Sequence, residues 1–133
     1  MKTDFLCPHC RGYLNVGNNV VFTIRQKGWK GGILLLSPEL GDYSYSIHPS
    51  HRVEPDDQFD FHCPICHFDL SVPGSENMAK VLFREDDKYE FYIVFSRKKG
   101  ELCTYKISET KIESSWGEHH MEYIDFLSAS LFK

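Results

Sequence analysis

The sequence contains one twelve-residue pattern twice. Residues 5–16 read FLCPHCRGYLNV and residues 61–72 read FHCPICHFDLSV, an offset of 56 positions. Each stretch has a Cys-Pro-x-Cys pair, preceded by phenylalanine and followed by leucine and valine. Two thiolates separated by two residues can reach one ion from one tight turn, and two such turns supply the four ligands that a structural zinc ion prefers. The sequence therefore predicts one metal site, with the ligands Cys7, Cys10, Cys63 and Cys66.

These two pairs resemble the zinc knuckles of a zinc ribbon, and the resemblance is limited to residues 5–16 and 61–72. It implies a structural zinc held by the four cysteines, in a module that contacts protein or nucleic acid. The chain departs from the family in its spacing, because 52 residues lie between Cys10 and Cys63. In a compact two-knuckle site, about 15 to 20 residues separate the two cysteine pairs. A substantial part of the fold must therefore lie between the two knuckles.

Iron is the alternative metal, because rubredoxin also holds one ion with two such cysteine pairs. The segment after Cys10, Arg11-Gly12-Tyr13, resembles its first loop. The second knuckle departs from that family, since His67 and Phe68 follow Cys66 where its pattern has glycine. We therefore expect zinc and keep a rubredoxin-like iron redox protein as an alternative. Four thiolates fill the coordination shell, so this site is not expected to be catalytic.

Runs of β-branched, aromatic and aliphatic residues predict strands throughout both halves of the chain. The order of these runs favours antiparallel pairing between neighbours. We predict a mostly β (α+β) fold, in which two similar knuckle-plus-antiparallel-β-meander halves are joined by one Zn(Cys)4 site. The predicted strands are 20–24, 32–36 and 43–47 in the first half, and 80–84, 89–96 and 102–107 in the second.

The similarity of the halves extends beyond the knuckles when short gaps are allowed. Residues 20–22 then align with 81–83, and residues 33–37 align with 92–96. Any two strand-rich stretches can be aligned in this way, so chance similarity is the alternative to duplication outside the knuckles. Within the knuckles, duplication is the better interpretation.

The C-terminus is the one segment with a helical pattern. Ser115 followed by Glu118 resembles a capping box, and apolar residues then recur at spacings of three and four. This stripe either covers a sheet or docks a second subunit. The 133 residues are therefore expected to form one domain, composed of a first half (1–60), a second half (61–114) and a C-terminal helix (115–132).

Composition limits the classes of function. With 41% hydrophobic residues the chain can form a real core, and it has neither a membrane-spanning run nor an apolar leader. A cytoplasmic location is expected, where cysteines remain available as metal ligands. No nucleophile triad, phosphate loop or carboxylate pair stands out, so we do not expect an enzyme. The fifth cysteine, Cys103, is interpreted as a small apolar residue in a strand.

Charge is a test of nucleic-acid binding. The formal net charge is −4, and it divides evenly: residues 1–75 have 6 basic and 8 acidic side chains, and residues 76–133 have 9 and 11. General attraction to phosphate is therefore absent. Two local basic turns remain, and we interpret them as equivalent tips of the two halves. The candidate binding residues are Arg25, Lys27, Trp29 and Lys30 in the first turn, and Arg97, Lys98 and Lys99 in the second.

The sequence thus favours a non-enzymatic interaction module that binds zinc and a partner protein. It does not identify that partner. A nucleic-acid-binding zinc ribbon that uses the basic tips is the first alternative, and the iron redox protein is the second. No membrane partner is expected. The oligomeric state is left open.

Overall fold

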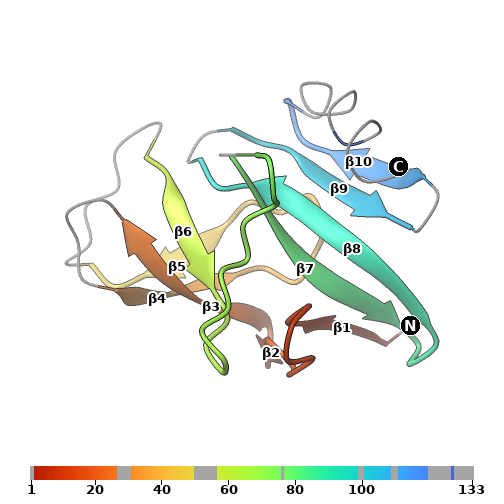
Figure 1. The fold of residues 1–133 in the computed structure, drawn as a ribbon, viewed down its shortest axis with the longest axis horizontal. Coiled ribbons are helices and arrows are strands. Elements are labelled where there is room, and N and C mark those ends of the chain that lie inside the picture. The colour runs from red at the N-terminus through yellow and green to blue at the C-terminus, as the bar shows by residue number, and fades with distance from the viewer. Residues whose placement is uncertain are drawn as a thin grey trace.

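The computed structural model describes residues 2–26, 31–49, 57–75, 77–98, 101–108, 111–119 and Leu127. Within these residues the protein is mostly β, as predicted, with two antiparallel sheets and almost no helix (Figure 1). The strands are β1 (Thr3–Leu6), β2 (Asn15–Val16), β3 (Asn19–Gln26), β4 (Gly32–Leu36), β5 (Tyr45–Ile47), β6 (Phe59–His62), β7 (Met78–Glu85), β8 (Tyr89–Ser96), β9 (Thr104–Ile107) and β10 (Ile112–Trp116).

The two halves exchange their first strands. One sheet has the order β1-β7-β8-β9-β10, so the strand before the first knuckle pairs with the second half. The other has the order β2-β3-β4-β5, and β6, the strand before the second knuckle, pairs with β3 of the first half. Each sheet is therefore completed by a strand from the other half of the chain. We call these the C-terminal sheet and the N-terminal sheet.

The strand pairings repeat between the halves. The bridges Leu6↔Tyr13 and His62↔Asp69 differ by 56 positions. After the knuckles the offset becomes 59, because Leu34 pairs with Phe22 and Ile47 while Ile93 pairs with Val81 and Lys106. The prediction of two similar halves is therefore confirmed at the level of register.

The register also corrects two details of the predicted alignment. Residues 33–37 and 92–96 are equivalent, as predicted, but Val20-Val21-Phe22 corresponds to residues 79–81 and not to 81–83. The shift is two residues, so it keeps each side chain on the predicted face of its strand. The turn equivalent to residues 27–31 is the β7–β8 turn at Asp86 and Asp87, not the turn at Arg97, which follows β8. The interpretation of the two basic turns as equivalent tips was wrong.

The main core lies between the two sheets. Alternate residues of β3 point inward, so Phe22 and Ile24 are buried together with Val81 and Phe83 of β7. Aromatic rings join the sheets, with the Phe95 centroid 5.9 Å from that of Phe22 and 5.2 Å from that of Phe61. Burial of each such side chain contributes about 1.5–3 kcal/mol. This shared core holds the two sheets face to face.

The predicted C-terminal helix, 115–132, starts too early. Ser115 and Trp116 belong to β10, which pairs with β9 and extends the C-terminal sheet. Of the expected helix, residues 120–126 and 128–133 lie outside the described residues. Leu127 is helical and fully buried in a second core cluster, on the outer face of the C-terminal sheet, with Cys103 and Tyr105.

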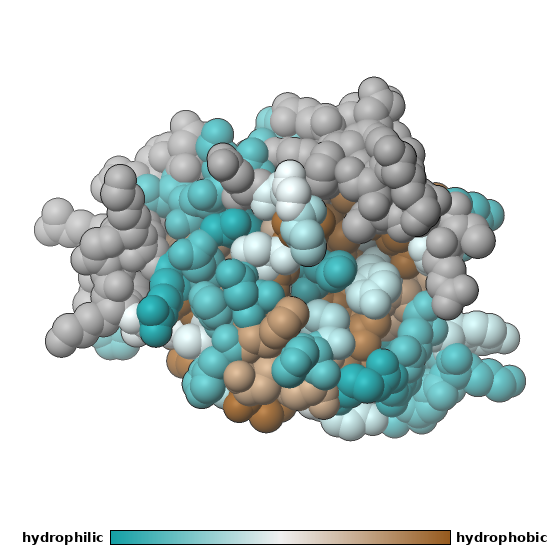
Figure 2. Space-filling model, viewed as in Figure 1, coloured by the Kyte–Doolittle hydropathy of each residue, from teal (hydrophilic) through white to brown (hydrophobic). Residues whose placement is uncertain are grey.

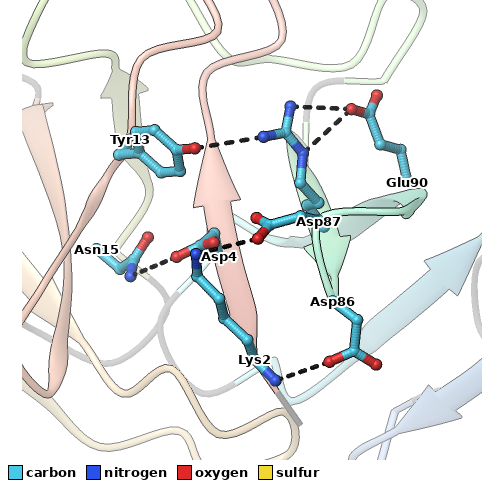
Figure 3. Close-up of polar contacts among 8 residues, drawn as sticks. Lys2, Asp4, Tyr13, Asn15, Asp86, Asp87 and Glu90 are labelled. Carbon is cyan, nitrogen blue, oxygen red and sulfur yellow. Dashed lines mark hydrogen bonds and ion pairs between the residues drawn. The ribbon is translucent and has the colours of Figure 1, made fainter.

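Polar contacts tie the exchanged strand β1 to the β7–β8 hairpin (Figure 3). The Lys2 backbone N–H donates to Asp86 Oδ1 at 2.9 Å, and its Nζ pairs with Asp87 Oδ2 at 3.2 Å. Arg84 donates both to Tyr13 of the first knuckle and to Glu90. Each of these exposed pairs contributes little to stability by itself. Together they fix the position of β1 beside the second half.

Candidate metal centre

Each knuckle is a tight turn between a strand and a short return segment. In the first, the Cys7 N–H donates to the Gly12 carbonyl at 3.0 Å and the Arg11 N–H to the Cys7 carbonyl at 2.9 Å. The second has the same bonds at the same lengths, Cys63 to Phe68 and His67 to Cys63. The loops that follow β1 and β6 both lie at the lower edge of the view in Figure 1. The two cysteine pairs are therefore presented at one end of the molecule.

A left-handed residue follows the second cysteine of each knuckle. Arg11 has φ 60° and His67 has φ 65°, a region in which a Cβ atom is unfavourable. Local strain is therefore built into both turns.

His67→Gly is expected to be more stable than His67→Ala by about 1 kcal/mol, because only glycine relieves the strain of the positive φ. The side chain of His67 is exposed, so neither substitution removes a packed group. Chemical denaturation of both metal-loaded variants measures the difference. Equal stabilities would contradict this account of the turn.

The four sulfur atoms all lie within 4.8 Å of one another. The closest contacts cross between the knuckles, with Cys7 Sγ 3.7 Å from Cys66 Sγ and Cys10 Sγ 3.8 Å from Cys63 Sγ. The prediction that these cysteines form one cluster is confirmed. A metal ion held here is shared by the two halves of the chain.

The sulfur spacing fits a tetrathiolate metal ion. A regular tetrahedron whose corners lie about 2.3 Å from a central ion has edges of about 3.8 Å. The two cross-knuckle distances agree with such edges. The same edges suit iron, so the geometry identifies a four-thiolate site and not the element.

Backbone amides point at the sulfur atoms. The N–H groups of His9 and Ile65 donate to Cys7 and Cys63, each at 3.3 Å, and the Gly12 N–H donates to Cys10 Sγ at 3.4 Å. Hydrogen bonds to a thiolate favour its charged form. The turns thus offset part of the cost of gathering negative charge at a site where Cys7 and Cys63 are fully buried.

The knuckles also contact each other through equivalent positions. The His9 ring stacks on Phe68, with centroids 4.6 Å apart and planes 3° from parallel. The counterpart contact places Ile65 over Gly12, where an added Cβ would overlap Ile65 Cδ1. Ile65 is exposed and Cδ1 is the end of its flexible side chain, so it can shift to admit a larger residue at position 12. These contacts flank the cysteine cluster, in which Cys10 remains exposed and Cys66 half-buried, and Figure 2 shows apolar atoms at this lower edge of the molecule.

Burial and hydrogen bonding shift the pKa values of the thiols in opposite directions. Burial raises the pKa of Cys7 to about 12 and also raises that of Cys63. The Phe68 N–H, with a smaller contribution from His9, lowers the pKa of Cys66 to about 6. Without metal, burial therefore favours the protonated form of Cys7 and Cys63, whereas the hydrogen bond from Phe68 favours the thiolate of Cys66.

Metal loading at pH 7 is expected to release a proton from each of Cys7 and Cys63. Because their pKa values are raised, protons compete with the metal at neutral pH, so binding strengthens as the pH rises from 7 to 9 and weakens toward 5. Each displaced proton changes the binding constant about tenfold per pH unit. Calorimetric titration in two buffers of different ionisation enthalpy measures the protons released, and a buffer-independent heat would contradict the prediction.

Of the candidate binding-tip residues, the structure describes Arg25, Arg97 and Lys98. Lys27, Trp29, Lys30 and Lys99 lie outside the described residues. Arg25 is exposed on β3, whereas Arg97 is buried: its guanidinium donates to the Phe59 carbonyl at 2.9 Å and pairs with Asp60. Lys98 is half-buried and bridges to Gln58. Arg97 thus joins β6 to the end of β8.

Comparison with known proteins gives no relative. No family model, curated protein or solved structure matches this chain. Among the described residues, no helix is long and apolar enough to cross a membrane.

Sequence reasoning identified the ligands but not their immediate neighbours. The stacking of His9 on Phe68 and the contact of Ile65 with Gly12 were not predicted, although the offset of 56 gave a signal: positions 9 and 65 are equivalent, as are 12 and 68. In a twofold arrangement, a contact made by one pair has to recur at the other.

Proposed function

We propose that this chain is a non-enzymatic interaction module in which one structural zinc ion holds together two interlocked halves that bind a partner protein. The observation that carries the proposal is the sulfur cluster. Two cysteines from each half approach across the knuckles at 3.7 and 3.8 Å, so one ion links segments 53 or more positions apart. Structural zinc sites of four cysteines contribute directly to folding energy.

A structural role fits the ligand set better than a catalytic one. A catalytic zinc ion keeps one position for water or substrate, whereas here four thiolates are available for four positions. Cys7 and Cys63 are fully buried, and the backbone amides of both turns point at the sulfurs. We therefore assign no enzymatic activity to this centre.

A protein partner fits the charge better than a nucleic acid. The net charge is −4, the buried Arg97 is already paired with Asp60, and the turn equivalent to residues 27–31 contains Asp86 and Asp87. A nucleic-acid surface would need unpaired cations aligned along the phosphates. We also propose a cytoplasmic location, because a reducing compartment preserves thiolate ligands.

The metal content and absorption spectrum of the protein, purified without added metal, test the metal assignment. One colourless zinc ion per chain is expected. One iron ion per chain with a visible thiolate-to-metal band would replace the structural zinc with an electron-transfer centre. Absence of any bound metal would overturn the module as proposed.

Fluorescence anisotropy with labelled single-stranded and duplex oligonucleotides tests the choice of partner. We expect no binding at about 50 mM salt, where phosphate attraction is strongest, and none at about 200 mM. Binding that falls steeply between these concentrations would favour the nucleic-acid-binding alternative. In that case, reversal of Arg25 and Lys27 should reduce the slope with salt.

A further inference from the structure

An apolar pocket opens between the two sheets. It has a volume of about 160 Å³, and buried side chains of both sheets line its floor, among them Phe22 and Leu34 from one and Val81 and Ile93 from the other. The rest of its lining, which we call its mouth, comes from described residues of the loops that follow β4 and β8, among them Leu40, Asp42, Lys98 and Glu101. These loops occupy equivalent positions in the two halves at the offset of 59. The pocket therefore lies on the axis that relates the halves.

The size of this pocket suits one side chain. A cavity of about 150 Å³ lined by apolar side chains binds benzene, whereas drug-sized ligands occupy about 300–1,000 Å³. Phe22, Phe61 and Phe95 all line it, and their rings meet in tilted or T-shaped pairs with centroids 5.2 to 5.9 Å apart. Another aromatic ring can join such a cluster in the preferred edge-to-face geometry.

The lining of the pocket contains charged residues of both signs. The lining includes the carboxylates of Glu39, Asp42 and Glu101, opposed by Lys98 and by the Arg97 guanidinium, whose charge is paired with Asp60. Asp42 accepts a hydrogen bond from the Ser44 N–H at 3.0 Å, which favours its charged form. Among the described lining residues, three are therefore acidic and two are basic, and the basic Arg97 is already paired with Asp60. A group entering this mouth is favoured if it carries positive charge beside its apolar part.

We propose that the pocket binds an aromatic side chain of a partner protein segment that has basic residues next to it. Aromatic anchors in well-packed pockets contribute most of the energy of many protein interfaces, and a polar rim surrounds them. The proposal rests on the proposed function, since it specifies where the module binds protein and which chemistry it recognises.

Two-dimensional NMR of the metal-loaded protein tests this with defined peptides. The probe is an acetylated and amidated pentapeptide with phenylalanine between two pairs of lysines. Saturable shifts are expected at amides of the lining, such as Leu34, Ile93 and Phe95. The peptide with central alanine should bind about 30-fold more weakly or not at all, because the anchor is lost. The peptide with glutamates in place of lysines should also bind more weakly.

Two variants and one control variant test whether the peptide binds in the pocket. Leu40→Trp places a larger side chain at the pocket wall and should abolish the shifts. Glu39→Lys reverses one exposed rim charge and should weaken the lysine peptide, whereas Glu118→Lys, the same change at an exposed position outside the lining, should not. Metal content and thermal midpoint of each variant establish that it is folded.

The possible outcomes test the pocket proposal separately from the proposed structural module. Equal binding of the phenylalanine and alanine peptides, or no binding by either, overturns the pocket proposal. Toluene binding as tightly as the peptide, with no effect of the lysines, also overturns it and favours a small-molecule site. None of these results depends on the metal content. The metal analysis therefore tests the proposed structural module independently of the pocket.

Discussion

Cys63→Ser is expected to release the metal and to lower the thermal midpoint by about 15 °C or more. Cys63 is fully buried and supplies one of the four thiolates that link the halves. A cross-link over a segment of this length is worth about 4 kcal/mol in chain entropy, and about 1 kcal/mol changes the midpoint of a domain of this size by about 4 °C. Elemental analysis and calorimetry measure the two effects together.

Cys103→Ala is the matched control, because it also removes a fully buried cysteine. Cys103 lies in the core cluster on the outer face of the C-terminal sheet, outside the metal cluster. It should retain one metal ion per chain and lose about 1–2 kcal/mol of stability through the lost packing. If Cys63→Ser kept both its metal content and its thermal midpoint, the centre would not be the clamp proposed here.

Gly117→Ala is expected to destabilise the protein by about 3 kcal/mol or more. Gly117 has φ +99°, and an added Cβ would overlap the Leu102 carbonyl oxygen and lie 2.5 Å from Tyr43 Oη. The Leu102 backbone has no freedom to retreat, because its carbonyl accepts from the His119 N–H at 2.8 Å and its N–H donates to His119 Nδ1 at 3.0 Å. Backbone strain and steric overlap therefore add.

Gly17→Ala separates these two contributions. Gly17 also has a positive φ, +58°, but no atom lies within 4 Å of the added Cβ. The Gly17→Ala variant should lose only about 1 kcal/mol of stability, because the left-handed conformation is its one source of strain. Urea denaturation of both variants measures the difference, and equal losses would show that the overlap with Leu102 relaxes without cost.

The cysteine cluster was predictable because its signal is local. Two Cys-Pro-x-Cys pairs define two turns, and four thiolates that could hold one tetrahedral ion are expected to meet whatever lies between them. Strands such as β3 and β8 were also predictable, since their runs of β-branched and aromatic residues favour a pleated, half-buried surface. These features depend on neighbouring residues in sequence.

The exchange of β1 and β6 was not predictable in the same way. Both strands are only four residues long, and their partners lie in the opposite half, so no local pattern reveals the pairing. The end of the second half was misjudged at Ser115, where a capping-box pattern competed with pairing to β9 and the ladder prevailed. The apolar pocket likewise depends on two sheets meeting, which residue spacing alone does not encode.

The strand exchange has a consequence for synthesis of the protein on the ribosome, which proceeds from the N-terminus. When the first half has emerged, β3 still has an open edge from Thr23 to Gln26, and Cys7 and Cys10 hold only half of a coordination shell. Neither is completed until residues 59–66 leave the exit tunnel, and β1 finds its partner only when β7 follows. The nascent chain therefore has no finished folding unit until most of it has been translated, and its exposed strand edge must be protected until then.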